Sequence, residues 1–530
     1  PVELGMLSTL ALFATWQTLT IAASFNRPWD VSDCSQFAGS AKPALDNGSR
    51  VLNATYYAAG GLNITNVSNS KPLCRIFGET DYANNNTVLF QLWLPASADY
   101  SNRFLVVGNG GMAGTIDEAA LMKNLNEGYA VAGGDGGHRA SDNNGGSGEP
   151  GVHLPYMHDQ AQVRAWIHNS IALFTPVARS LAEQFYQEPA KHIYYVGCST
   201  GGAQGFALAQ YHPGLFDGII AGCPGNWYSH LALSFLWNSQ KTQGHTADTR
   251  NDQGSSYLPQ SALDLITKSA LAQCDAMDGV EDGVIENPLL CDFDFNSLAC
   301  DSSDTDPTGC LTEAQLAAAR NIYAGPVDSH TKASLYPGFS LGSETQWAMQ
   351  EGELANAFTI PILQNMVFDN LTYDSGNFDW GSDVDLLDER VGTYIDEISP
   401  DLSAFQKAGG KMIVMQSWAD PYNAALWPIQ HLKQLEEASG GNVGDWFRLF
   451  MVPGGGHCGP ASNYPQVPGN WHSLEAMTEW VESKVLPEEM TSSNPTDNSS
   501  RTRKLCPWPK TAKYTGGNTD EWTSYECGSA

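Results

Sequence analysis

The chain has 530 residues and a formal net charge of −31, from 58 acidic and 27 basic side chains. This deficit of lysine and arginine excludes nucleic acid as an expected partner, because phosphate binding requires clustered positive charge. The length exceeds what a single hydrophobic core usually supports, so we expect two domains or one large insertion.

An apolar segment lies near the N-terminus. Residues 6–22 are mostly apolar and run into Ile-Ala-Ala-Ser, a small-residue pattern typical of a signal cleavage site. No lysine or arginine precedes Leu7, and threonine, serine, glutamine and tryptophan interrupt the run. A membrane span is therefore disfavoured. We predict a signal peptide at residues 1–24, and a secreted protein with no membrane anchor.

Short apolar runs rich in β-branched and aromatic residues predict a series of buried strands. The first group comprises residues 88–94, 104–107, 129–132, 192–196 and 218–221. Two more, 411–416 and 447–452, follow only after a long gap. We interpret residues 237–406 as a lid inserted into a catalytic domain made of residues 25–236 and 407–530.

Ser199 is the candidate nucleophile. It stands in a Gly-Cys-Ser-Thr-Gly pattern between the predicted strand 192–196 and a predicted helix at 203–211. Strand, sharp turn and helix are the context in which an α/β-hydrolase presents its serine, and the small residues after it allow close helix packing. The alternative interpretation is an ordinary glycine-rich turn.

The oxyanion of acyl transfer needs two backbone N–H donors. Thr200, directly after the serine, would supply the first. The second would come from the Gly-Asn-Gly-Gly-Met stretch after strand 104–107, where Gly110 and Gly111 allow a ligand to approach the backbone. A plain strand-to-helix turn would also favour glycine here.

A serine becomes nucleophilic when a histidine removes its proton and a carboxylate orients that histidine. In α/β-hydrolases the chain order is serine, acid, histidine. Asp420 follows the apolar run 412–415, and His457 follows strand 447–452 through a glycine-rich turn. Asp420 has an alternative role as N-cap of a helix predicted at 423–438.

Each of the two proton-exchanging residues has a cysteine next to it, Cys198 before Ser199 and Cys458 after His457. If the serine and histidine touch, these cysteines come close enough for a disulfide, whose Cα atoms lie about 5.5–6 Å apart. The patterns together predict a secreted serine esterase with an α/β-hydrolase fold and a large inserted lid domain.

In combination, Cys-Ser, then Ala-Asp-Pro-Tyr, then His-Cys resembles the tannase and feruloyl esterase family, over about residues 88–485. The resemblance implies a Ser199, Asp420 and His457 triad, a Cys198–Cys458 bridge, and small phenolic esters or feruloylated oligosaccharides as substrates. Some tannases of this family are cleaved at dibasic sites in the lid, and residues 237–406 contain no adjacent basic pair. Release of ferulic and related acids from plant cell-wall polysaccharides is therefore expected, with gallate release by a tannase as the alternative.

The resemblance also implies a structural Ca²⁺ in an acidic loop between Cys274 and Cys291. Carboxylate and carbonyl oxygens suit this ion, which takes six to eight oxygen ligands. The expected ligands are Asp275, Asp278, Val280, Asp282 and Val284. The spacing is not that of an EF-hand, and a solvated acidic turn is the alternative.

Eleven cysteines and seven Asn-x-Ser/Thr sequons favour an oxidising, secretory route. The sequons are at Asn47, Asn53, Asn63, Asn66, Asn85, Asn370 and Asn498. Proximity and the family pattern give five bridges: Cys34–Cys74, Cys198–Cys458, Cys274–Cys291, Cys300–Cys310 and Cys506–Cys527. Cys223 is left over at an apolar strand end, where a buried thiol behaves as a small hydrophobe. A remote alternative for the whole chain is a hydrolase fold that only binds and does not catalyse.

Overall fold

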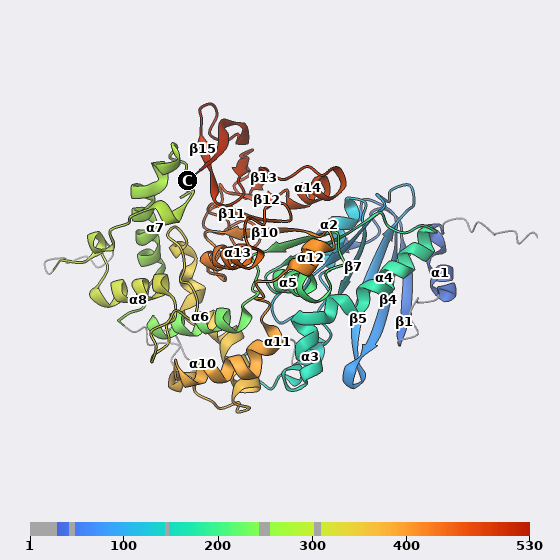
Figure 1. Ribbon diagram of the computed structural model, residues 1–530, viewed down its shortest axis with the longest axis horizontal. Helices are drawn as coiled ribbons and strands as arrows, with labels where there is room; N and C mark the ends of the chain where they lie inside the picture. Colours follow the sequence, from blue (N-terminus) through green and yellow to red (C-terminus); the bar gives the residue numbers. More distant parts are fainter. Residues whose placement is uncertain (1–28, 42–47, 144–147, 243–254, 302–308, 530) are drawn as a thin grey trace, which may run out of the picture.

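A nine-stranded sheet forms the centre of the molecule (Figure 1). The computed structural model describes residues 29–41, 48–143, 148–242, 255–301 and 309–529, so the predicted signal peptide and the Asn47 sequon lie outside the described residues. In spatial order the strands are β1 (Ser49–Tyr57), β4 (Leu73–Tyr82), β5 (Asn86–Pro95), β7 (Ala130–Gly134), β6 (Arg103–Val107), β8 (His192–Cys198), β9 (Gly218–Gly222), β10 (Lys411–Ser417) and β11 (Phe447–Val452). Neighbours from β1 to β7 pair antiparallel, and those from β7 to β11 pair parallel.

Both faces of the parallel half are buried, which explains why its strands are almost wholly apolar. In β6, Phe104 and Val106 join the core on one face, whereas Leu105 and Val107 join the core on the other. Successive side chains of a strand point to opposite faces, so one apolar strand serves both cores.

Helices cover each face of the sheet (Figure 1). One core takes residues from α4 (Ser170–Tyr186), α5 (Thr200–Tyr211) and α13 (Leu426–Ser439). The opposite core takes residues from α2 (Glu118–Asn126) and α14 (Ser473–Thr478). This layered arrangement is an α/β-hydrolase fold, as the sequence predicted.

The described residues between β9 and β10 form helices and turns, and no named strand. The longer helices of this segment are α6 (Tyr228–Lys241), α7 (Gln260–Cys274) and α8 (Glu313–Ala324), which gather on one side of the sheet (Figure 1). The proposed boundaries of the lid domain, residues 237 and 406, fall inside α6 and inside α12 (Ser403–Lys407).

Beyond the main sheet, β12 (Pro468–Trp471), β13 (Met490–Pro495) and β14 (Arg503–Leu505) form a three-stranded sheet. A hairpin of β15 (Lys510–Tyr514) and β16 (Tyr525–Ser529) follows. No helix among the described residues has the length and apolar character needed to cross a membrane.

All five predicted disulfides are confirmed, and the pair Cys506–Cys527 joins the C-terminal hairpin to the residues just before it. Their presence is consistent with folding in an oxidising compartment.

Candidate active site

Ser199 occupies the sharp turn between β8 and α5. Its backbone has φ 60° and ψ −116°, a conformation that L-residues rarely adopt. The Ser199 N–H donates to the Gly222 carbonyl at 2.8 Å, and the Ser199 carbonyl accepts the Gly225 N–H at 3.1 Å. These bonds hold the serine in a strained turn above the sheet, which is the geometry of a nucleophile elbow.

The glycines that follow Ser199 are required by close packing. A Cβ on Gly201 would lie 2.9 Å from the Asn109 carbonyl oxygen, and a Cβ on Gly202 would lie 2.7 Å from Pro224 Cα. Real Cβ atoms do not approach other atoms this closely. Only glycine therefore lets α5 begin directly behind the serine.

Asp420 and His457 meet in the loops that follow β10 and β11. His457 Nδ1 lies 2.9 Å and 3.0 Å from the two Asp420 carboxylate oxygens. Oδ1 of Asp420 also accepts the N–H groups of Tyr422, at 2.8 Å, and Asn423, at 3.1 Å. Helix α13 begins later, at Leu426, so Asp420 is not its N-cap.

The Asp420 side chain is fully buried. Burial alone would raise its pKa, but the His457 ring and the N–H bonds from Tyr422 and Asn423 hold the pKa below its ordinary value. A buried carboxylate that stays ionised can fix the tautomer of His457 and stabilise its charged form.

The Cys198–Cys458 disulfide connects the two loops, with a Cα to Cα distance of 6.1 Å. It joins the residue before Ser199 to the residue after His457. Among the contacts of the described residues, no hydrogen bond links the Ser199 hydroxyl to the His457 ring. The parallel sheet places both loops at one edge, and the bridge links them there. Catalytic hydrogen bonds often tighten only when substrate binds.

The glycine loop after β6 lies beside the start of α5. The Thr200 hydroxyl donates to the Gly111 carbonyl at 2.7 Å, and Trp166 Nε1 donates to the same carbonyl at 3.2 Å. Among the described residues, the N–H groups of Gly110 and Gly111 have no acceptor. No atom lies within 4 Å of where a Gly110 Cβ would be. The loop thus offers unpaired N–H donors next to Thr200.

Cys223 contacts the histidine loop, which its sequence position did not reveal. The thiol is fully buried, and its sulfur accepts the Cys458 N–H at 3.2 Å. Burial, with the charge of Asp420 nearby, raises the pKa of the thiol well above its ordinary value. A thiol that stays protonated is a poor nucleophile toward the adjacent disulfide.

The inserted segment contacts the loop that carries Asp420. Gln346 and Gln350, in the 3₁₀ helix η9 (Glu344–Glu351), donate at 2.5 Å to the carbonyls of Ala419 and Pro421. These carbonyls flank Asp420 on both sides. The contact partners lie 71 to 73 residues apart in sequence, so no local pattern could have predicted them.

The acidic loop predicted to hold Ca²⁺ surrounds an arginine that the sequence did not single out. Arg503 forms ion pairs with Asp278, Asp282 and Glu286, and the side chains of Arg503, Asp278 and Asp282 are at most 4% exposed. Asp275 accepts the N–H groups of residues 282–284. One buried oxygen each of Asp278 and Asp282 lacks a hydrogen-bond partner, which suits a hard cation.

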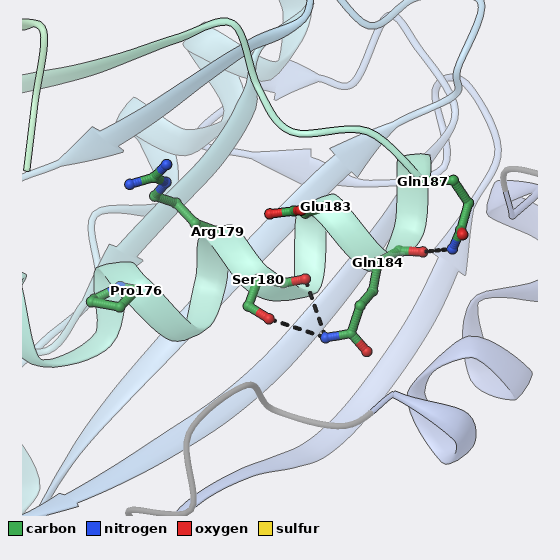
Figure 2. A pocket seen from close by; sticks show the side chains of 6 residues that line it. All are labelled: Pro176, Arg179, Ser180, Glu183, Gln184 and Gln187. Atoms are coloured by element: carbon green, nitrogen blue, oxygen red, sulfur yellow. Dashed lines mark hydrogen bonds between the residues drawn. The ribbon is translucent and has the colours of Figure 1, made fainter.

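Two cavities lie in very different places. One of about 410 Å³ is lined by both cysteines of the Cys198–Cys458 bridge and by Gly110, and it extends between α2 and α14. Another, of about 550 Å³, runs along α4 and is lined by Pro176, Arg179, Ser180, Glu183, Gln184 and Gln187 (Figure 2). No triad loop contributes to the second cavity, so it is not a candidate ester site.

The sequence model of the family described as tannase and feruloyl esterase matches residues 74–528. The chain belongs to this family. Feruloyl esterase C of Talaromyces stipitatus is 29% identical over 509 residues, covering 90% of this chain and 91% of the relative. An uncharacterized esterase of Xanthomonas campestris is 30% identical over 507 residues, covering 86% and 84%.

A crystal structure of an esterase from Aspergillus oryzae superposes on this tannase and feruloyl esterase family member with a TM-score of 0.83, at 27% identity, covering 94% of this chain and all of that one. Membership of the family makes the chain a carboxylic ester hydrolase.

Proposed function

We propose that this family member is a serine esterase that hydrolyses esters of hydroxycinnamic acids, releasing ferulic and related acids from plant cell-wall polysaccharides. The observation that carries the proposal is the contact between His457 Nδ1 and the Asp420 carboxylate. The Cys198–Cys458 bridge links the loop of this histidine to the strained turn that holds Ser199. The Talaromyces stipitatus relative is named a feruloyl esterase, which supports a hydroxycinnamic acid as the acyl group of the substrate.

In the proposed mechanism the Ser199 oxygen attacks the ester carbonyl while His457 takes its proton. The carbonyl oxygen becomes an oxyanion, which the N–H groups of Thr200 and of Gly110 or Gly111 stabilise. His457 then protonates the departing alcohol, and Ser199 keeps the acyl group as an ester. A water molecule, deprotonated by His457, attacks that ester and releases the acid.

The acyl preference is tested by kcat/KM on methyl ferulate, methyl p-coumarate, methyl caffeate, methyl sinapate and methyl gallate, with Ser199→Ala protein as the blank. The proposal predicts that the hydroxycinnamates are preferred. Preference for gallate would identify a tannase instead. No turnover of any ester would overturn the catalytic proposal and favour a protein that only binds.

We also propose that Ca²⁺ stabilises the acidic loop. The ligands would be Asp275, Asp278 and Asp282, with the carbonyls of Val280 and Val284. The buried Oδ1 of Asp282, which has no hydrogen-bond partner, supports this assignment, as does the buried Oδ2 of Asp278, whose one contact is the ion pair with Arg503 at 3.5 Å. Arg503 would balance the negative charge that one ion leaves uncompensated. The ion would be structural, because the nucleophile of the reaction is a serine.

Secretion is proposed from the five disulfides and the sequons. The six sequon asparagines among the described residues are all exposed: Asn53, Asn63, Asn66, Asn85, Asn370 and Asn498. Exposure is what a glycosylated asparagine requires. Digestion of the secreted protein with an endoglycosidase should lower its mass, and an unchanged mass would contradict glycosylation.

A further inference from the structure

We propose that Gln204 positions the oxyanion donors: its side-chain amide fastens the glycine loop after β6 to the helix that begins at the nucleophile. The inference rests on the serine esterase function proposed above. Gln204 does not reach the reacting atoms, so it is a positioning residue.

Gln204 makes reciprocal hydrogen bonds to one loop residue. Its Oε1 accepts the Asn109 N–H at 3.0 Å, and its Nε2 donates to Asn109 Oδ1 at 3.0 Å. Nε2 also donates to the Trp166 carbonyl at 2.8 Å, while the Tyr195 hydroxyl donates to Oε1 at 3.2 Å. Gln204 is fully buried, so water does not compete for these bonds.

The loop is held on both sides of Gly110. Gln204 lies one helical turn after Thr200 on α5, so the two side chains share a helix face. Thr200 holds the Gly111 carbonyl at 2.7 Å, and Gln204 holds the Asn109 N–H. The unpaired N–H groups of Gly110 and Gly111 thus keep a fixed position relative to the Thr200 N–H.

Asn109 is itself anchored to the protein on its other side. Its Nδ2 donates to the carbonyls of Thr115, at 2.9 Å, and Gly134, at 2.7 Å. These two bonds fix the orientation of the Asn109 amide, so that its Oδ1 must face Gln204 as an acceptor. The donor end of the Gln204 amide therefore faces Asn109 Oδ1, and the acceptor end faces the Asn109 N–H.

Mutation of Gln204 to Met tests the inference, because methionine has a similar length but cannot make these bonds. We expect kcat on methyl ferulate to fall about 10²-fold, the loss typical of one oxyanion donor, while KM changes less than about twofold. An aryl boronic acid supplies a second readout. Ser199 bonds to its boron as the serine proton passes to His457, and a boronate oxygen then occupies the oxyanion position.

We therefore expect the boronate affinity of Gln204→Met to fall by the same factor as kcat/KM. The affinity for free ferulate, which forms no tetrahedral adduct, should not change. Gln210→Met is the matched control: Gln210 is on the same helix and bonds to Glu397, at 2.9 Å, and to the Ser399 N–H, at 3.0 Å, away from the loop. That variant should lower Tm without changing kcat or boronate affinity.

If Gln204→Met does not fold, Tyr195→Phe provides a milder test, since it removes only the hydroxyl that bonds to Gln204 and to the Gly201 carbonyl. The same pattern with a smaller loss, about threefold to tenfold in kcat, is then expected. A folded Gln204→Met with wild-type kcat and boronate affinity, or with ferulate affinity reduced equally, would overturn the inference. Wild-type protein inactive on every ester would instead refute the proposed function.

Discussion

At the residue scale, Asp420 is the point where four contacts meet, one of them a hydrogen bond that Gln416 Nε2 donates to its Oδ2 at 3.3 Å. Its carboxylate receives the His457 ring and two backbone N–H groups, and these contacts outweigh the effect of burial on its pKa. An anion this deep in the protein is costly unless every contact compensates it. A buried negative charge at this position is explained if it orients the His457 ring and stabilises its protonated form.

Substitution of Asp420 by Asn tests this role. The Asn Oδ1 would still accept the Tyr422 and Asn423 N–H groups, but its amide nitrogen would face His457 and demand an acceptor at Nδ1. The ring would then carry its proton on Nε2 and could not accept one from Ser199. We expect kcat to fall by about 10³–10⁴-fold with Tm nearly unchanged, measured by steady-state kinetics and calorimetry. A loss below about tenfold would contradict this role.

The sequence predicted the positions of those candidate residues that lie in local patterns: Ser199 in its turn, and Asp420 and His457 each after an apolar strand. It also predicted Cys223 as a free, buried thiol, which is confirmed, but it revealed neither the contact of Cys223 with the histidine loop nor the roles of Gln204 and Arg503. Their contacts join residues 235, 95 and 221 positions apart, to Cys458, Asn109 and Asp282. Contacts at such separations follow from the packing of the whole fold, which no local spacing records.

At the element scale, the proposed triad lies in loops that follow three parallel strands, β8, β10 and β11. The Cys198–Cys458 bridge ties the first loop to the third, and η9 of the inserted segment holds the second. The reacting groups are therefore positioned by connections between elements rather than by any one element.

Replacing Cys198 and Cys458 together by Ser should lower kcat/KM by about tenfold or more, because the loops of Ser199 and His457 then move independently. The control replaces Cys300 and Cys310 by Ser, which opens a bridge of 10-residue separation in the inserted segment. That control should keep wild-type kcat/KM. Equal activity of both double variants would show that the bridge does not position the triad.

Asp396 ties the end of the inserted segment to the start of α6, where it accepts the Ser229 N–H at 2.9 Å. Burial raises its pKa to about 7. Since the folded pKa exceeds the unfolded value of about 3.9, this group's contribution to stability is full below that value and is lost as pH rises through about 7.

Asp396→Asn mimics the protonated acid, so its Tm should exceed that of wild type by a margin that grows from pH 5 to pH 8 and reaches about 2 °C or more at pH 8, measured by calorimetry. Asp401→Asn is the control, because hydrogen bonds from the Ser403 N–H and the Ser403 side chain lower the pKa of that carboxylate. It should give no gain at pH 8. An Asp396→Asn protein no more stable than wild type at pH 8 would refute the assignment.

Strand prediction succeeded in the parallel half of the sheet and failed at its antiparallel edge. The predicted run 192–196 corresponds to β8, and 447–452 coincides with β11. The edge strand β1 has only one buried residue, Ala54, so it lacks the apolar run by which buried strands are recognised. Its place is set by pairing with β4, a contact outside its own sequence.

At the scale of the whole molecule, the acidic loop joins the inserted segment to the C-terminal sheet. Arg503 of β14 enters the loop between Cys274 and Cys291, and Glu286 accepts the Ala512 N–H of β15 at 2.7 Å. Two parts of the chain more than 200 residues apart thus share one buried charge cluster. A cation there would stabilise the assembly of both parts.

Removal of Ca²⁺ with EDTA should therefore lower Tm by several degrees, and added Ca²⁺ should restore it, because an ion that binds only the folded state shifts unfolding by mass action. Asp282→Asn should abolish this shift. Asp294→Asn, a substitution of a capping residue in the same segment, should keep it. Protein that contains no Ca²⁺ by metal analysis and shows no Tm change on its addition would contradict the proposal.

Ser199 is the residue proposed to carry the acyl group, and trapping it with a covalent reagent tests that role. The protein is treated with a fluorophosphonate, the adduct is located by peptide mass spectrometry, and residual kcat on methyl ferulate is measured against the fraction labelled. We expect one adduct, on Ser199, with activity lost in proportion to labelling, and no adduct in the Ser199→Ala protein. Full activity in fully labelled protein, or an adduct at another residue that accounts for the loss, would contradict it.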